Sequence, residues 1–402
     1  MSAVRKPKSL RGAGAGEGSV SAAPDSAPGG DPVVARMAAF ALDGEIRGQS
    51  SAIEALTTAV TSGRAHHAWI IHGPAGVGKC STALRCAALL VDPQTTADDR
   101  AAFSPPRVTR SAELLRGGTH PDIHLIRRDL AAASADRELR ERKQLSIPIG
   151  LLRERMLGGS SGDGKSFESV VGRTPFMGMG KCFVIDGADE MEVEGQNALL
   201  KTLEEPPAGT FIFLITPHED RLLPTIRSRC RRLRFNTLSE DDMALALGES
   251  LGALSATEQA WVRRFSAGSP GRAHLAASRG LSKWAVEIEG AMDQCHSGQF
   301  PVAFAERLAE LAGEYADAAV KENERLSKES ANRDGTSLVL AIAGESVRRR
   351  LSESIAEARD EDAQRMAQWT DALVDCERHL RANVNMRFAF AELAILMHSG
   401  AE

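Results

Sequence analysis

A glycine-rich segment, GPAGVGKC at residues 73–80, has the residue types and spacing of a loop that holds phosphate groups. Successive backbone N–H groups in such a loop surround phosphate oxygens, and its lysine adds a positive charge for the outer phosphates. The pattern usually closes with serine or threonine, whose hydroxyl ligates Mg²⁺, but Cys80 stands at that position. Mg²⁺ prefers hard oxygen ligands, and a thiol is softer and larger. The segment therefore predicts a phosphate cradle, leaves nucleotide binding open and argues against efficient hydrolysis.

The predicted nucleotide site continues at Asp186, which follows a predicted buried strand over residues 182–185. A carboxylate for Mg²⁺ belongs at this place in phosphate-loop folds. The next residue is Gly187, where many hydrolysing proteins have a glutamate that activates water, so this second departure affects the same step. Asp189 and Glu190 are interpreted as a solvated acidic turn. The loop itself contributes these predicted cofactor-binding residues: Gly73, Pro74, Ala75, Gly76, Val77, Gly78, Lys79 and Cys80.

Five arginines lie within the segment RSRCRRLR at residues 227–234, and most of them are interpreted as a solvated basic face. Arg229 differs because it follows a predicted short helix just before a strand, a placement from which an arginine can reach a phosphate on a neighbouring subunit. Arg272, in GSPGRA, opens a predicted helix after a Pro-Gly turn. The sequence leaves open whether Arg272 touches a nucleotide or is simply exposed.

The elements that must position these residues are buried strands alternating with helices. Strands are predicted over residues 68–72, 123–126, 182–185 and 210–216. Such alternation, with strands that end in polar or glycine residues, predicts a doubly wound parallel sheet of the α/β class. Ligands bind at the carboxyl ends of the strands in these sheets, and the loop, Asp186 and Thr216 all lie at those ends. From about residue 236 the pattern becomes helical.

The composition predicts an ordinary globular chain of two or three domains, with 402 residues, 43% hydrophobic and 26% charged. A net charge of −5 argues against a general polyanion binder, so any nucleic-acid contact needs a local patch. Six scattered cysteines without a CxxC pair fit a reducing cytoplasm, and no apolar run is long enough to span a membrane. Residues 1–39 are predicted to be a disordered tail.

Three further features are interpreted as structural. Ser51 and Glu54 have capping-box spacing at the start of a predicted helix. The Gly/Ser-rich residues 158–164 are predicted to be a surface loop. Four histidines that lack metal-ligand spacing are interpreted as loop or core residues: His66, His67, His72 and His120.

Five segments occur in an order that indicates a family: GRAHHAWIIHGPAGVGKCSTA, GGTHPD, VIDGADEMEVEGQNALLKTLEEPP, LLPTIRSRC and GSPGRA. Together they resemble the clamp-loader subunits of bacterial DNA polymerase III, the delta-prime type most of all. The resemblance is close from about Asp43 to Arg234, weaker through residues 236–280 and only architectural beyond. The pair NALLKTLEEPP and LLPTIRSRC is highly specific.

The resemblance implies an AAA+ nucleotide-binding domain over residues 40–235, a helical lid over 236–280 and a helical collar over 281–402. Proteins of this family load the sliding clamp onto primed DNA in the cytoplasm. The implied partners are gamma/tau and delta subunits in a hetero-pentamer, the clamp and primed DNA, with no membrane. Such a subunit of the DNA-directed DNA polymerase holoenzyme has no polymerase activity of its own, and here its ATPase is expected to be weak or absent.

By the same resemblance, Ser228, Arg229 and Cys230 form the segment whose arginine acts in trans on the neighbour's ATP. Thr216 corresponds to the sensor threonine and Arg272 to the lid arginine. Family members usually carry four zinc-binding cysteines between the loop helix and HPD, whereas only Cys86 lies there in this chain. We therefore expect no zinc, and at most weak binding of ATP and Mg²⁺.

Other functions stay open at this point. The gamma/tau motor of the same complex is the alternative within the family, although Cys80 and Gly187 count against it. An independent phosphate-loop kinase or a stand-alone ATPase is disfavoured by the RSRC segment and the helical C-terminal region. A transcription activator of the same superfamily is disfavoured because no helix-turn-helix is evident near the end of the chain.

Overall fold

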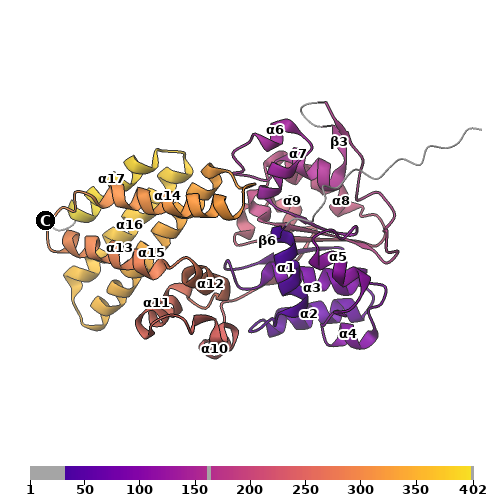
Figure 1. Cartoon of the computed structure of the whole chain (residues 1–402), viewed down its shortest axis with the longest axis horizontal. Helices are drawn as coiled ribbons and strands as arrows, with labels where there is room; N and C mark the ends of the chain where they lie inside the picture. Colours follow the sequence, from indigo (N-terminus) through magenta and orange to yellow (C-terminus); the bar gives the residue numbers. More distant parts are fainter. Residues whose placement is uncertain (1–31, 161–163, 400–402) are drawn as a thin grey trace, which may run out of the picture.

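In the computed structural model, which describes residues 32–160 and 164–399, a parallel β-sheet domain is followed by helices (Figure 1). The five strands pair in the order β2-β5-β6-β1-β7, and every pairing is parallel. The strand bounds are β1 (Ala68–His72), β2 (Ile123–Ile126), β5 (Lys181–Asp186), β6 (Thr210–Thr216) and β7 (Arg231–Arg234). The predicted α/β fold with a parallel sheet and a helical C-terminal region is confirmed.

The strands are apolar along nearly their whole length because helices cover both faces of the sheet. Ile71 of β1 belongs to one hydrophobic cluster and its neighbour Ile70 to another, as expected when successive side chains of a strand point to opposite faces. In Figure 1, α1–α5 lie below the sheet and α6–α9 above it. Their bounds are α1 (Pro32–Asp43), α2 (Ser50–Thr61), α3 (Lys79–Val91), α4 (Ala97–Ala101), α5 (Arg110–Arg116), α6 (Arg137–Arg140), α7 (Ile149–Leu152), α8 (Val193–Glu204) and α9 (Pro224–Arg227).

Helix α1 corrects the prediction of a disordered tail over residues 1–39. The helix begins at Pro32, so the prediction is wrong for residues 32–39, and residues 1–31 lie outside the described part of the chain. Ala38, Ala41 and Leu42 are buried, and α1 packs on α3 and α5. Burial of this small-residue face stabilises the helix, although its alanines look like low-complexity sequence.

The start of α2 is a second correction, because Ser51 and Glu54 do not form the predicted capping box. The N-cap is Gln49, whose side chain makes no cap hydrogen bond. The Gln49 amide instead donates to the backbone oxygen of Asn236 at 2.7 Å and accepts from its N–H at 3.2 Å. The helix start is therefore fixed by a long-range contact that local spacing does not reveal.

The predicted surface loop at residues 158–164 lies partly outside the described residues, which exclude 161–163. On either side of this gap, β3 (Gly159–Ser160) pairs with β4 (Ser166–Phe167) in antiparallel fashion. The described residues of the segment therefore enter a short two-stranded ribbon.

The rest of the chain is helical, and a five-helix bundle lies at the left of Figure 1. Phe304, Leu308 and Leu311 are buried along one helix of this bundle, at the helical spacing seen in the sequence. None of the helices in the described ranges is long and apolar enough to span a membrane. The predicted domain boundaries at 236 and 281 stay a prediction. The helices are α10 (Glu240–Leu247), α11 (Ala256–Ser266), α12 (Pro270–Ser278), α13 (Leu281–His296), α14 (Phe304–Glu322), α15 (Lys328–Ala356), α16 (Asp360–Arg381) and α17 (Met386–Ser399).

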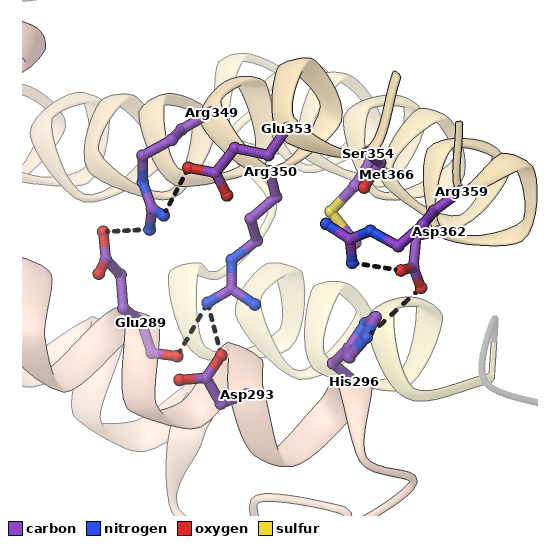
Figure 2. A pocket seen from close by; sticks show the side chains of 10 residues that line it. All are labelled: Glu289, Asp293, His296, Arg349, Arg350, Glu353, Ser354, Arg359, Asp362 and Met366. Atoms are coloured by element: carbon purple, nitrogen blue, oxygen red, sulfur yellow. Dashed lines mark hydrogen bonds and ion pairs between the residues drawn. The ribbon is translucent and has the colours of Figure 1, made fainter. Parts of the chain in front are cut away.

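Ion pairs join the bundle helices around a polar cavity of about 320 Å³ between α13, α15 and α16 (Figure 2). Arg349 lies 3.3 Å from Glu289, and Arg350 lies 2.7 Å from Asp293, so both pairs connect α15 to α13. Because these charges neutralise one another, the cavity is interpreted as a structural seam between helices.

Arg128 connects the bundle to the sheet domain. Its guanidinium donates to Asp334 of α15 at 2.7 and 2.9 Å and to Glu190 at 2.6 Å. The Arg128 side chain is 19% exposed, so these bonds are shielded enough to be stronger than a typical surface ion pair.

Two histidines near β2 are neutral core residues. The His120 ring lies 2.9 Å from the Ser111 hydroxyl through Nε2, and its Nδ1 accepts the backbone N–H of Asp122 at 3.1 Å. Burial lowers the pKa of both His120 and His124 to about 4. The interpretation of His120 as a core residue is confirmed by its 6% exposure.

We expect the chain to lose stability as the pH falls from about 6.5 towards 4. Burial depresses the folded-state pKa of His120, so its contribution to stability is complete above pH 6.5, the ordinary pKa of histidine, and is lost as the pH falls and the ring is forced to protonate. This loss amounts to about 2 kcal/mol for His120 at pH 5. In urea unfolding, His120→Gln should reduce the difference between pH 7 and pH 5 by about that amount. The exposed His218, changed to Gln, should leave the difference nearly as it is, and equal effects of both variants would contradict the assignment.

Candidate functional site

The predicted phosphate loop lies between β1 and α3. Gly73, Gly76 and Gly78 have φ values of 131°, 78° and 93°, which only glycine adopts without strain. Gly78 precedes Lys79, the first residue of α3. Within the described ranges, the N–H groups of residues 76–79 have no backbone acceptor, so they form an unpaired donor set at a helix N-terminus.

Helix α12 packs directly onto this loop. The N–H of Gly271 donates to the Gly76 carbonyl at 2.9 Å, and the Ser269 hydroxyl donates to the Ala75 carbonyl at 2.8 Å. A Cβ atom on Gly271 would lie 2.8 Å from Gly76 Cα, which leaves no space for a side chain. Both glycines are therefore required by the close approach of the two backbones.

Lys79 is folded back onto its own loop. Its Nζ donates to the carbonyls of Gly73 and Pro74 at 2.6 and 2.5 Å, and the residue is 7% exposed. Burial lowers the pKa of Lys79 to about 8, although Asp186 and Asp189 act in the opposite direction. The lysine is thus placed at the loop, and none of the described residues forms a direct ion pair with it.

Asp186, at the end of β5, is already paired with a cation. Nη1 of Arg127 donates to Asp186 Oδ2 at 3.1 Å, and Nε of the same guanidinium donates to Asp129 Oδ1 at 3.1 Å. Burial lowers the pKa of Arg127, but the two carboxylates outweigh it and leave this pKa above its usual value. Burial also raises the pKa of the Cys80 thiol, and the nearby Asp186 adds to this effect.

These contacts do not fit a Mg²⁺ ion in its usual place. Cys80 presents a protonated thiol instead of a hydroxyl, and Asp186 would have to exchange Arg127 for the metal. The displaced guanidinium would then face a divalent cation, a like-charge contact in a shielded place. The donor set therefore disfavours Mg²⁺, and the expectation of at most weak binding of ATP and Mg²⁺ stays a prediction.

Two further predicted site residues point elsewhere. The Thr216 hydroxyl donates to Asp189 Oδ1 at 2.7 Å and accepts the N–H of His218 at 2.9 Å. The Asp189 side chain is only 5% exposed, so its interpretation as part of a solvated turn is wrong. The Arg272 guanidinium stacks over the ring of Phe265, 4.6 Å from its centre.

Arg229 lies apart from the loop, directly after α9. It forms an ion pair with Glu204 of α8 at 2.5 Å and donates to the Thr225 carbonyl at 3.0 Å. Its side chain is 36% exposed, and the pair is held only at the surface. A surface pair of this kind is weak, so Arg229 can exchange Glu204 for another acceptor.

A cavity of about 760 Å³ borders the loop. Residues 75–81, Asp186 and Gly187 form part of its lining, and much of the remaining lining is an apolar wall. Thr216, Arg229 and Arg272 are not among the residues that line it. The apolar wall comprises Met37, Phe40, Ile46, Leu238, Leu245 and Leu247.

Sequence reasoning missed Arg127 and the contribution of α1. Arg127 directly follows a strand that was predicted correctly, and that position alone places it at the carboxyl edge of the sheet. Met37 and Phe40 were assigned to the tail or its border, although an apolar repeat through VVARMAAFAL is visible in the sequence. Across residues 32–160 and 164–399, no group of three His, Cys, Asp or Glu residues is arranged to hold a metal, and the expectation of no zinc stays a prediction.

A comparison with protein families now identifies the region around the loop. Residues 48–239 match the family model described as DNA polymerase III, delta subunit. The matched range covers slightly less than half of the chain. The matched region contains the loop, Asp186 and Arg229, and the predicted resemblance to clamp-loader AAA+ subunits is confirmed.

Proteins named as delta' subunits and proteins named as gamma subunits of DNA polymerase III are both similar to this chain. The DNA polymerase III subunit delta' of Pseudomonas aeruginosa is 34% identical over 170 residues, 42% of this chain and 43% of that protein. The delta' subunit of Bacillus subtilis is 28% identical, over 47% of this chain and 48% of that protein. The gamma subunit of Buchnera aphidicola is 28% identical, over 50% of this chain and 46% of that protein. The chain therefore spans about half the length of these curated relatives.

Replacing Gly271 with alanine should destabilise the contact between α12 and the loop. The added Cβ would overlap the Gly76 backbone, and overpacking of this kind costs about 1–3 kcal/mol. Urea unfolding followed by tryptophan fluorescence measures the loss. Gly290→Ala is the matched control, because a Cβ there meets nothing within 4 Å and α13 should be unchanged or gain about 0.5–1 kcal/mol. Equal stabilities of the two variants would contradict the close packing.

Proposed function

We propose that this chain is a clamp-loader subunit of DNA polymerase III of the delta-prime type. In this role it assembles in the cytoplasm with gamma/tau and delta subunits and helps to load the sliding clamp onto primed DNA. The match of residues 48–239 to the family model described as DNA polymerase III, delta subunit, supports the assignment to this complex. The observation that carries the non-motor role is the ion pair between Arg127 and Asp186, because it occupies the carboxylate that a motor needs for Mg²⁺.

Three features of the chain's own site argue against a motor. Cys80 replaces the metal-binding hydroxyl, Asp186 is paired with Arg127, and Gly187 lacks the carboxylate that activates water. The Glu190 carboxylate lies 3.0 Å from the place of a Gly187 Cβ, but Arg128 holds Glu190 at 2.6 Å. Burial raises the pKa of Glu190, but the carboxylate would have to leave its ion pair with Arg128 before it could turn to a water molecule.

The gamma/tau motor remains the alternative, since relatives named gamma also resemble this chain. A stand-alone phosphate-loop ATPase is a further alternative. Both alternatives require hydrolysis at the chain's own loop, and the same three features count against them.

Arg229 is the proposed working residue, acting in trans on a nucleotide held by the neighbouring subunit. Its support is its place in the RSRC segment, its distance from the chain's own cavity and its exchangeable surface pair with Glu204. A guanidinium supplied in this way stabilises the charge that develops on a transferred phosphoryl group.

The isolated chain should show negligible ATP hydrolysis. The missing hydroxyl, the occupied carboxylate and the missing water-activating carboxylate all affect the same chemical step. Phosphate release from purified protein with ATP and Mg²⁺ measures this directly. Turnover at the rate of a motor subunit that disappears in Lys79→Ala would instead support the gamma/tau or stand-alone alternative.

In the reconstituted complex, Arg229→Ala should lower the ATPase stimulated by clamp and DNA, and clamp loading with it. An arginine finger is worth about 10³–10⁵ in rate in well-studied cases, and one finger among several sites should cost less. The folded chain should survive the change, since a surface pair contributes about 0–1 kcal/mol. Arg232→Ala, which removes a neighbouring exposed arginine, is the matched control.

Lys79→Ala in the same chain should harm the complex much less than Arg229→Ala. This ranking is expected because the chain's own loop is not the hydrolysing site in the proposed role. The opposite ranking would overturn the proposed function, and an Arg232→Ala effect as large as that of Arg229→Ala would remove the special role of Arg229.

A further inference from the structure

Arg127 stands where the phosphate-loop fold ordinarily keeps a metal ion. It directly follows β2, and β2 pairs with β5 so that Ile126 lies opposite Ile185, next to Asp186. The guanidinium bonds to Asp186 Oδ2 at 3.1 Å and lies close enough to influence the Cys80 thiol. A fixed positive charge therefore lies beside the two residues at the expected metal position.

The guanidinium keeps donors available after these bonds are counted. Nε serves Asp129, and Nη1 serves Asp186 and the Met37 sulfur, whereas Nη2 has no acceptor among the described residues. The Arg127 side chain is 30% exposed; it is not itself among the residues that line the cavity, but it contacts two that are, Met37 and Asp186. Guanidinium groups bind phosphate oxygens through paired N–H donors, so the remaining group suits a phosphate.

The cavity itself fits a nucleotide in volume and polarity. Its volume of about 760 Å³ falls in the range of small-molecule sites. The unpaired N–H groups of residues 76–79 form one end, and Met37, Phe40 and Leu245 contribute to an apolar wall. Phosphates at the loop and a base against the apolar wall would use both surfaces.

We propose that this cradle binds a nucleoside di- or triphosphate without a divalent metal ion, and that Arg127 supplies the positive charge beside Asp186. The proposal rests on the proposed function only in taking the site to be non-hydrolysing. Arg127 would neutralise phosphate charge beside Asp186, but it would not supply the Lewis-acid activation that Mg²⁺ gives in hydrolysing sites. The site thus retains the ligand without preparing it for in-line attack.

Calorimetric titration of the full chain with ATP and with ADP, in EDTA and in excess Mg²⁺, tests the proposal. The dissociation constants in the two conditions should agree within about threefold, because no binding energy comes from a metal. Arg127→Ala should weaken binding in EDTA by about tenfold or more, the loss expected for one charge-assisted contact to phosphate. The Arg127→Ala variant should recover affinity when Mg²⁺ is added, because its Asp186 is no longer paired with an arginine. In EDTA, the affinity of Arg127→Lys should lie between those of the unchanged chain and Arg127→Ala.

Arg128→Ala is the matched control, because it removes the adjacent positive charge but contacts Glu190 and Asp334 instead of Asp186. Its affinity in EDTA should stay within about threefold of the unchanged chain. Thermal unfolding verifies that each variant is folded. Inorganic tripolyphosphate should bind more weakly than ATP if the apolar wall receives the base, and equal binding would contradict that part.

The proposal is overturned if the unchanged chain binds nucleotide only with Mg²⁺, or binds none in either condition. It is also overturned if Arg127→Ala and Arg128→Ala weaken nucleotide binding in EDTA to the same extent. These outcomes leave the proposed function intact, because that function is tested by the Arg229 variants in the reconstituted complex. Conversely, Mg²⁺-independent binding by a chain whose Arg229→Ala variant keeps full clamp loading would support this inference and contradict the proposed function.

Discussion

Parallel pairing of strands that are buried on both faces is the constraint on which the site depends. It brings the carboxyl ends of β1, β2 and β5 to one edge, so the loop, Arg127 and Asp186 meet although they are far apart in the sequence. The strands tolerate few polar residues along their length, and the chemistry is therefore confined to the positions just beyond them.

At this edge the decisive contact is between Arg127 and Asp186. A carboxylate in the low dielectric of a partly buried site needs a positive partner, and the side chain of Arg127 supplies one. Cys80 is compatible with that arrangement, since a neutral thiol next to Asp186 adds no further charge. The altered loop residue and the arginine thus form one consistent set, in which the cradle is kept and the metal chemistry is not.

Most strands of the sheet and the phosphate loop could be predicted from the sequence, because they depend on local patterns. The bounds of β1, β2 and β6 agree with their apolar runs, and the glycines of the loop indicate that its backbone adopts positive φ values. What local patterns missed depends on long-range partners. Gln49 is the N-cap of α2 because its side chain bonds to the backbone of Asn236. Helix α1 forms because it packs on α3 and α5. The Thr216 hydroxyl donates to Asp189, although the end of its strand was predicted correctly. Neither spacing nor composition contains those distances.

Arg127 and Arg128 are consecutive, and their side chains go to different parts of the molecule. The first contacts Asp186 at the cradle, and the second bridges Glu190 to Asp334 on α15. Their Cα atoms are separated by one planar peptide unit of about 3.8 Å, which is among the stiffest links in a polypeptide. A single peptide unit therefore joins the residue that contacts the cradle to the residue that contacts the helical bundle, and neither ion pair can form unless the chain places both side chains from this one link.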